Sequence, residues 1–130
     1  MRRFGHILLL ALLAVSCGKV EQEDLLCTVT VECTFPDGAN AITLEVDSAP
    51  AGNYFRNMNT LEDFPIPTIV NNRCTMRVLK GAYLVAFDGT ATFADGTVRN
   101  VRCAGHSVPA QCVELLTDEA SLTLELVYLR

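Results

Sequence analysis

Hydrophobic and polar residues alternate along most of the chain from residue 27 onward. A period of two is typical of a β-strand with one face in a core and the other in water. The positions predicted to face the core are Cys27, Val29, Val31, Cys33 and Phe35; Ile42, Leu44 and Val46; Cys74, Met76 and Val78; Tyr83, Val85 and Phe87; and Leu122, Leu124, Leu126 and Tyr128. Leu84 and Ala86 are apolar as well, so we predict a strand around Tyr83 that is buried on both faces.

Turn-forming residues separate these strands. Pro36-Asp37-Gly38 ends the first strand, and Asp88-Gly89 and Asp95-Gly96 are predicted as further turns because aspartate and glycine favour turn conformations. A two-residue turn at Asp95-Gly96 would form a hairpin that places Phe93 opposite Val98.

The spacing of these segments predicts an all-β protein. About seven short strands with turns between them fit a single antiparallel β-sandwich of the immunoglobulin-like kind over residues 27–130. No stretch after Cys17 has a helical period, and a chain of 130 residues has room for one small domain. The only long helix expected is an N-terminal signal helix.

The first 17 residues have the pattern of an export signal. Arg2 and Arg3 precede an unbroken apolar run at residues 7–15, which is too short to span a bilayer as a helix. Ser16 and Cys17 follow. Residues 13–17 resemble a bacterial lipoprotein signal, in which the cysteine is acylated. The resemblance implies a signal peptide over residues 1–16 and lipidation at Cys17. An ordinary cleaved signal with an incidental cysteine is the alternative.

The next residues form a short acidic stretch. Residues 17–26 have no core-forming pattern, so we predict a flexible tether. Gly18-Lys19-Val20-Glu21-Gln22-Glu23-Asp24 also resembles the acidic export tags of surface lipoproteins in Bacteroides-type bacteria. The resemblance implies a lipid-anchored protein of the outer membrane, exposed at the cell surface. A periplasm-facing lipoprotein with a solvated spacer is the alternative.

The β domain also has a family resemblance. Leu79, Gly81, Tyr83 and Val85, together with the alternating residues 29–46, resemble the transthyretin-like (carboxypeptidase regulatory-like) sandwich. The lipid cysteine, the acidic tether and residues 24–27 are similar to fimbrial anchor and assembly lipoproteins, which are usually built from two such domains. The resemblance implies a fimbrial accessory or assembly role.

The charge of the chain bears on its possible partners, and its cysteine content bears on its cellular compartment. With 15 acidic and 10 basic residues and a pI near 4.9, the chain has an acidic balance that argues against nucleic-acid binding through a basic face, and no nucleic-acid partner is expected. Loss of residues 1–16 would remove two arginines and no acidic residue, which makes the remainder more acidic. Six cysteines suggest an oxidising compartment.

Five cysteines remain after Cys17. Cys103 and Cys112 flank a short loop and are the candidate disulfide, which would contribute about 2–3 kcal/mol. Cys27 and Cys33 lie about 20 Å apart on one strand, too far to bridge each other. Either could pair with Cys74, or all three could be small buried hydrophobic residues.

No catalytic, metal or cofactor site is predicted. Cys103, His106 and Cys112 have no zinc-type spacing and no evident fourth ligand. His106 is the only histidine after Cys17, so no nucleophile–histidine pair stands out. The aspartates next to glycines, at 37, 88 and 95, are interpreted as turn residues rather than Ca²⁺ or glycosidase carboxylates. A metal or thiol enzyme using Cys103, His106 and Cys112 is kept only as a third, unfavoured hypothesis.

Residues 48–67 are rich in proline, glycine and asparagine and are predicted to be mostly loop. Within them Tyr54, Phe55 and Arg56 form a candidate binding loop, because aromatic rings among amide and guanidinium groups suit sugars and peptides. The alternative is that Tyr54 and Phe55 cap the core. Ser48, in Asp47-Ser48-Ala49, resembles an O-glycosylation signal of the same bacteria.

The sequence therefore predicts a non-enzymatic envelope module that is attached to the membrane by an N-terminal lipid and binds an envelope protein or a glycan. A fimbrial accessory or assembly subunit that uses an edge strand is the alternative. No cofactor is expected.

Overall fold

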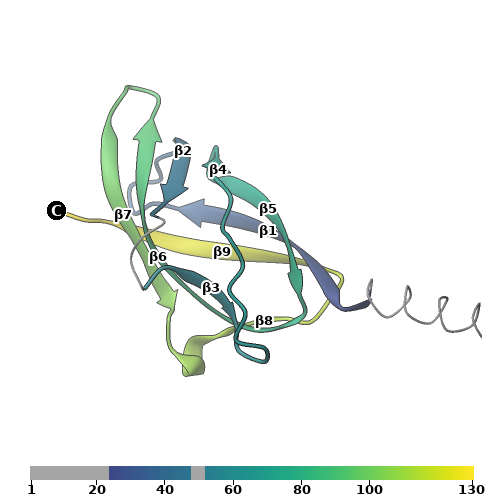
Figure 1. The fold of residues 1–130 in the computed structure, drawn as a ribbon. Coiled ribbons are helices and arrows are strands. Elements are labelled where there is room, and N and C mark those ends of the chain that lie inside the picture. The colour runs from purple at the N-terminus through teal and green to yellow at the C-terminus, as the bar shows by residue number, and fades with distance from the viewer. Residues whose placement is uncertain (1–23, 48–51) are drawn as a thin grey trace, which may run out of the picture.

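The computed structural model describes residues 24–47 and 52–130, which form a single nine-stranded sheet. Figure 1 shows the strands wrapped around a common core. Their bounds are β1 Leu26–Thr34, β2 Ala41–Val46, β3 Tyr54–Asn57, β4 Ile69–Val70, β5 Arg73–Leu79, β6 Gly81–Phe93, β7 Val98–His106, β8 Val113–Leu115 and β9 Glu119–Tyr128, with a 3-10 turn at Pro109–Gln111. The predicted all-β class is confirmed.

The sheet closes into a barrel instead of separating into two layers. Its hydrogen-bonded path runs β2-β4-β5-β1-β9-β7-β6, and β6 pairs again with β2. The long strand β6 makes this closure possible, because one edge pairs with β7 and β8 while the other pairs with β3 and then β2. The predicted sandwich is corrected to a closed barrel. Nine strands form in place of about seven, since β3, β4 and β8 are too short to show a period.

One pairing in the barrel is parallel. β1 lies antiparallel to β5, from Leu26↔Leu79 to Glu32↔Arg73, and parallel to β9, from Thr28↔Glu119 to Thr34↔Glu125. The prediction of a purely antiparallel sheet is therefore wrong at β1–β9. We call β5, β1 and β9 the wall.

Most predicted core positions are confirmed. The inward residues of β1, β5 and β9 are buried or half-buried, and Tyr83, Leu84, Val85 and Phe87 of β6 are all buried. Ile42 is an exception, with 43 % of its surface exposed. A bulge between Ala41 and Thr43 shifts the pairing of β2 with β6, so Ala41 and Leu44 point inward and Ile42 points out.

Two predicted turns differ in the structure. Asp88-Gly89 lies inside β6, where a side chain at Gly89 would approach the Glu45 carbonyl oxygen to 2.6 Å. This glycine permits close strand approach and makes no turn. Asp95-Gly96 does turn the chain, but through a three-residue loop, because Phe93 donates to Thr97 and Gly96 is left-handed at φ 85°. Val98 is therefore opposite Thr92 instead of Phe93.

The hairpin between β4 and β5 is closed by Asn71-Asn72, both with positive φ, as a two-residue hairpin turn requires. The Asn72 side chain accepts from the Ala41 amide at 2.8 Å and donates to the Ala39 carbonyl at 3.0 Å. It thereby ties this turn to the loop before β2.

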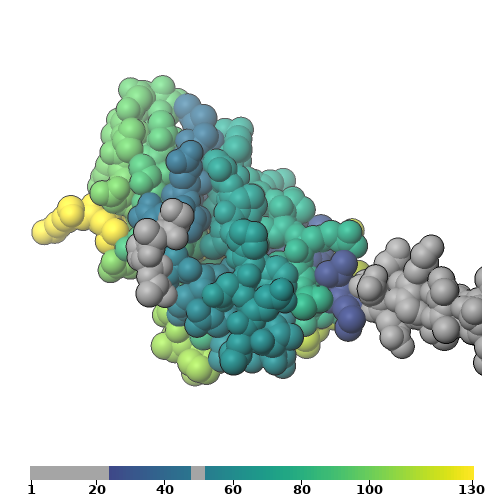
Figure 2. Space-filling view, viewed as in Figure 1, coloured from purple at the N-terminus to yellow at the C-terminus, as the bar shows by residue number. Residues whose placement is uncertain are grey.

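Residues 62–68, which we call the return segment, lead from β3 to β4. The space-filling view shows residues 52–68 over the face of the barrel turned toward the reader (Figure 2). Phe64 and Ile66 are half-buried against the core, and the flanking prolines are exposed.

Candidate functional site

The predicted binding loop is a strand. β3 pairs with β6 from Tyr54↔Ala86 to Asn57↔Tyr83, which corrects the prediction of loop at these residues. Strand alternation separates the three candidate residues. Phe55 points into the core, 1 % exposed, with its ring 5.0 Å from that of Tyr83. Phe55 is therefore a core residue, whereas Tyr54 and Arg56 are half-buried on the outer face.

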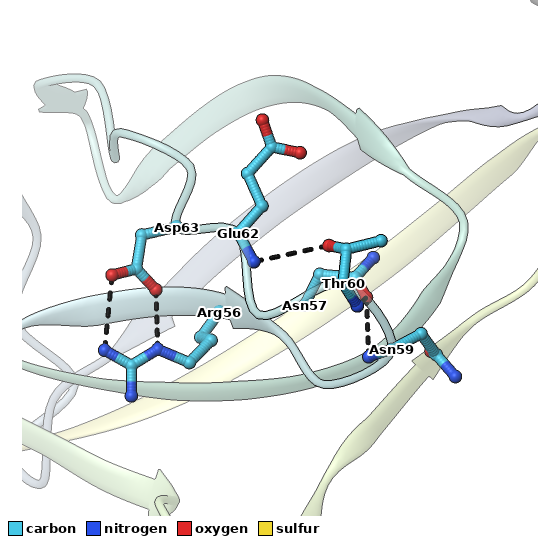
Figure 3. Close-up of polar contacts among 6 residues, drawn as sticks. All are labelled: Arg56, Asn57, Asn59, Thr60, Glu62 and Asp63. Atoms are coloured by element: carbon cyan, nitrogen blue, oxygen red, sulfur yellow. Dashed lines mark hydrogen bonds and ion pairs between the residues drawn. The ribbon is translucent and has the colours of Figure 1, made fainter.

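Arg56 is held in place on that face (Figure 3). Its Nε donates to Asp63 Oδ1 at 2.7 Å and an Nη donates to Oδ2 at 3.2 Å. This two-point hydrogen bond raises the pKa of Arg56. The guanidinium also lies 4.7 Å from the centre of the Tyr54 ring. The Arg56 charge is thus matched by Asp63, and one face of Tyr54 is covered.

The return segment folds back onto β3. The Asn57 amide donates to the Glu62 carbonyl, and the Phe64 amide donates to the Phe55 carbonyl, both at 2.9 Å. Leu61, in the turn between them, has a positive φ of 62°. Asp63 is placed opposite Arg56 by this backbone pairing and by the ion pair together.

Asn57 anchors the turn from inside, since it is fully buried. Its Oδ1 accepts from the Asn59 amide at 2.8 Å and the Thr60 amide at 3.1 Å (Figure 3). Its Nδ2 donates to the Tyr83 hydroxyl at 3.1 Å. Because the side chain is satisfied on both ends, this buried polar group is structural.

The same network explains the Leu79-x-Gly81-x-Tyr83 pattern. The Tyr83 hydroxyl donates to the Leu79 carbonyl four residues upstream, at 2.5 Å, an arrangement like the tyrosine corner of Greek-key proteins. Burial is the main cause of the raised pKa of Tyr83. A Cβ at Gly81 would lie 2.7 Å from Asn57 Nδ2 and from Asn59 Oδ1, so glycine is required there.

A groove of about 410 Å³ opens where β2 ends and β3 begins. Both strands pair with β6, and Pro65 of the return segment lines the groove beside them. Proline has no N–H to donate, so the ladder cannot continue there. The lining residues are Val46, Asp47, Asn53, Tyr54, Phe55, Asp63, Phe64, Pro65 and Ile66.

Asn53 fixes one side of the groove. Its Nδ2 donates to the Asp47 carbonyl at 2.6 Å, and its Oδ1 accepts from the Asp88 amide at 2.9 Å. The Asp47 amide in turn donates to the Asp88 carbonyl at 2.9 Å. The exposed Asp47 side chain therefore extends from a backbone that is bonded on two sides.

The predicted Cys103–Cys112 disulfide is not formed: all five cysteines of the described residues are free. Cys103 points into the core beside Val101 and is 1 % exposed, whereas Cys112 is half-buried after the 3-10 turn. Burial raises the pKa of Cys103 to about 11 and that of Cys33 to about 12. Cys27, Cys33 and Cys74 also remain thiols, as in the alternative in which they act as small hydrophobic residues.

The other residues considered as catalytic or metal-binding candidates make only structural contacts with nearby groups. His106 Nδ1 lies 2.9 Å from the Gln111 carbonyl oxygen, and in the described part of the chain no three acidic, histidine or cysteine side chains gather as metal ligands. Asp37 and Asp95 accept from amides two residues on, as turn residues do. Asp88 pairs with Arg102 at 2.7 Å.

Sequence reasoning missed Asp47, Asp63 and Phe64 as groove residues. The Pro65-Ile66-Pro67 sequence could have indicated an opening in the sheet, because two prolines separated by one residue prevent regular strand pairing.

The predicted signal peptide at 1–16, Cys17 and Ser48 lie outside the described residues. Among residues 24–47 and 52–130, no helix has the length and apolar character needed to cross a bilayer. Comparisons of the chain with protein-family models, with curated proteins and with solved structures gave no match.

Proposed function

We propose that this protein is a non-catalytic binding module whose recognition surface is the groove between β2, β3 and the return segment. One observation carries the proposal: an opening in the barrel surface is lined by residues whose positions are fixed. Asp47 is bonded through its backbone to β6 and Asn53, and Asp63 is held by Arg56. Side chains that are already ordered lose little conformational entropy on binding.

We further propose that the module is anchored by lipid at Cys17, after loss of residues 1–16, and that it faces the outside of the outer membrane. The alternative orientation faces the periplasm. The support is in the sequence, namely the charged and apolar run that ends at Ser16-Cys17 and the acidic tether. An envelope protein or a glycan is the expected partner. The transthyretin-like relationship of the domain remains a prediction from Leu79, Gly81, Tyr83 and Val85.

A second candidate function is a fimbrial accessory subunit that accepts a strand from a neighbour. One observation favours it: β5 pairs fully with β1, but on its other edge it pairs with β4 only at Arg73. In the described part of the chain, no strand pairs with the edge at Thr75 and Arg77. Such an edge can accept an extended chain. Strand donation predicts concentration-dependent oligomers, whereas the groove predicts a monomer that binds a partner.

The groove is tested by site-specific photo-crosslinking in intact cells. Tyr54→p-benzoylphenylalanine places the reactive group in the groove, and Thr123→p-benzoylphenylalanine on the exposed face of β9 is the matched control. We expect one discrete crosslinked product from position 54 that position 123 does not give. Equal or absent crosslinking at both positions would contradict the groove as the recognition surface.

A further inference from the structure

We infer that the groove accepts a lysine or arginine side chain presented by a segment of a partner protein. This inference rests on the proposed binding function and adds the chemical class of the partner. Three properties of the groove support it: an apolar floor, a carboxylate at the rim that no described cation pairs with, and an aromatic ring with one face already covered.

The floor suits a long aliphatic stem. Val46, Phe64 and Ile66 are half-buried and present apolar surface, and Pro65 adds its ring. Lysine and arginine cover such surface with their methylene groups while the charged end stays near water. A groove of about 410 Å³ has room for one such side chain and part of its flanking backbone.

The rim carries negative charge. Asp47 is exposed and forms no ion pair with a described residue. Asp63 is also at the rim, and Arg56 matches its charge. The groove therefore has one carboxylate more than it has cations. The chain as a whole has a formal charge of −5, which would attract a basic partner at long range.

The aromatic residues favour a peptide over a sugar. A sugar ring stacks on an open aromatic face, but the Arg56 guanidinium lies over one face of Tyr54, and the Phe55 and Phe64 rings are buried and half-buried against the core. The Asp47 carboxylate at the rim is an acceptor that no described side chain satisfies, and an ammonium or guanidinium would satisfy it with a charge-assisted bond.

The test titrates the full chain in detergent micelles with two blocked pentapeptides, acetyl-Gly-Leu-Lys-Leu-Gly-amide and the same peptide with norleucine in place of lysine. Norleucine keeps the stem and removes the charge. We expect the lysine peptide to bind about fivefold more tightly, the size of one exposed ion pair, and the difference to shrink as salt is raised. Asp47→Asn should abolish the difference, Asp47→Glu should retain it, and Asp95→Asn, in the β6–β7 loop, should leave it unchanged.

The outcomes separate this inference from the proposed function. Equal binding of both peptides, or a difference that survives Asp47→Asn, would overturn the cationic partner and leave the groove as a binding site. Binding of neither peptide, or a glycan as the product crosslinked at position 54, would overturn the inference in the same way. Loss of the position-54 crosslink itself would remove the proposed function, and this inference with it.

Discussion

The wall and the opposite side of the barrel are built by different means. In the wall, β1 is paired along nearly its whole length on both edges, with β5 and with β9. On the other side, β2 and β3 share one edge of β6, and the strand beyond them is reduced to the two residues of β4 and the proline-containing return segment. Backbone ladders hold β2 and β3 to β6, but the return segment is tied to β3 by two backbone bonds and by side chains such as the Arg56–Asp63 pair (Figure 3).

This difference indicates which side of the barrel can bind a partner. A fully paired strand has no backbone group left for a partner and resists local opening. A segment with two prolines cannot complete a ladder, so a groove remains beside it. We therefore expect the wall to carry stability and the return segment to carry function.

The largest effect should come from removing core volume in the wall. Leu124→Ala deletes a side chain that is 1 % exposed and should cost about 2–5 kcal/mol of unfolding free energy. Ile66→Ala, in the return segment, removes a half-buried side chain and should cost under about 1 kcal/mol. Urea unfolding of both variants measures the difference. A return-segment variant that costs as much as Leu124→Ala would break the comparison.

Disrupting the polar network around Asn57, which anchors the turn after β3, should give the next largest loss of unfolding free energy. Gly81→Ala forces a methyl group to within 2.7 Å of the Asn57 and Asn59 side chains and should cost about 1–3 kcal/mol. Gly105→Ala is the matched control, because nothing lies within 4 Å of its added carbon. A shift in urea midpoint for Gly81→Ala no larger than for Gly105→Ala would show that the network is not tightly packed.

Alkaline pH should weaken the wall through a buried thiol. Burial raises the pKa of Cys33 to about 12, so between pH 9 and 12 the unfolded chain loses this proton while the folded chain keeps it. The contribution of this thiol to stability is therefore fully present below about pH 9 and is lost as the pH rises through the folded pKa. In reducing buffer, the urea midpoint of Cys33→Ala should fall less steeply above pH 9 than that of the unchanged protein. Identical slopes would contradict the burial of this thiol.

The smallest effect should come from the ion pair at the groove. Arg56 and Asp63 have 36 % and 52 % of their side chains exposed, so solvent screens much of their attraction. Asp63→Asn should cost under about 1 kcal/mol of unfolding free energy while it frees Arg56 to move. A larger loss in urea unfolding would mean that this pair supports the barrel as well as the rim.

The alternation of residues along the chain predicted the wall well. Val29, Val31, Leu122 and Leu124 are buried where a period of two places them, because regular paired strands keep that period. The sequence could not predict that Ile42 points outward. The bulge that turns it out arises in the pairing of β2 with β6 and leaves no pattern in the local sequence.

The groove was predicted only in part. Tyr54 and Arg56 were singled out by residue type, but Phe55 belongs to the core because β3 is a strand. Asp47 and Asp63 meet the groove from segments that only the closed barrel brings together. Likewise, Gly89 resembles a turn glycine until the approach of β2 is known.

Native-state hydrogen exchange of the full chain tests the division between the wall and the return segment most directly. We expect amides of Val29, Val31 and Leu122 to exchange only through global unfolding, and those of Ile66 and Thr68 to exchange through local opening with a much smaller free energy. Equal protection of both groups would contradict the account, because the return segment would then be as firmly held as the wall.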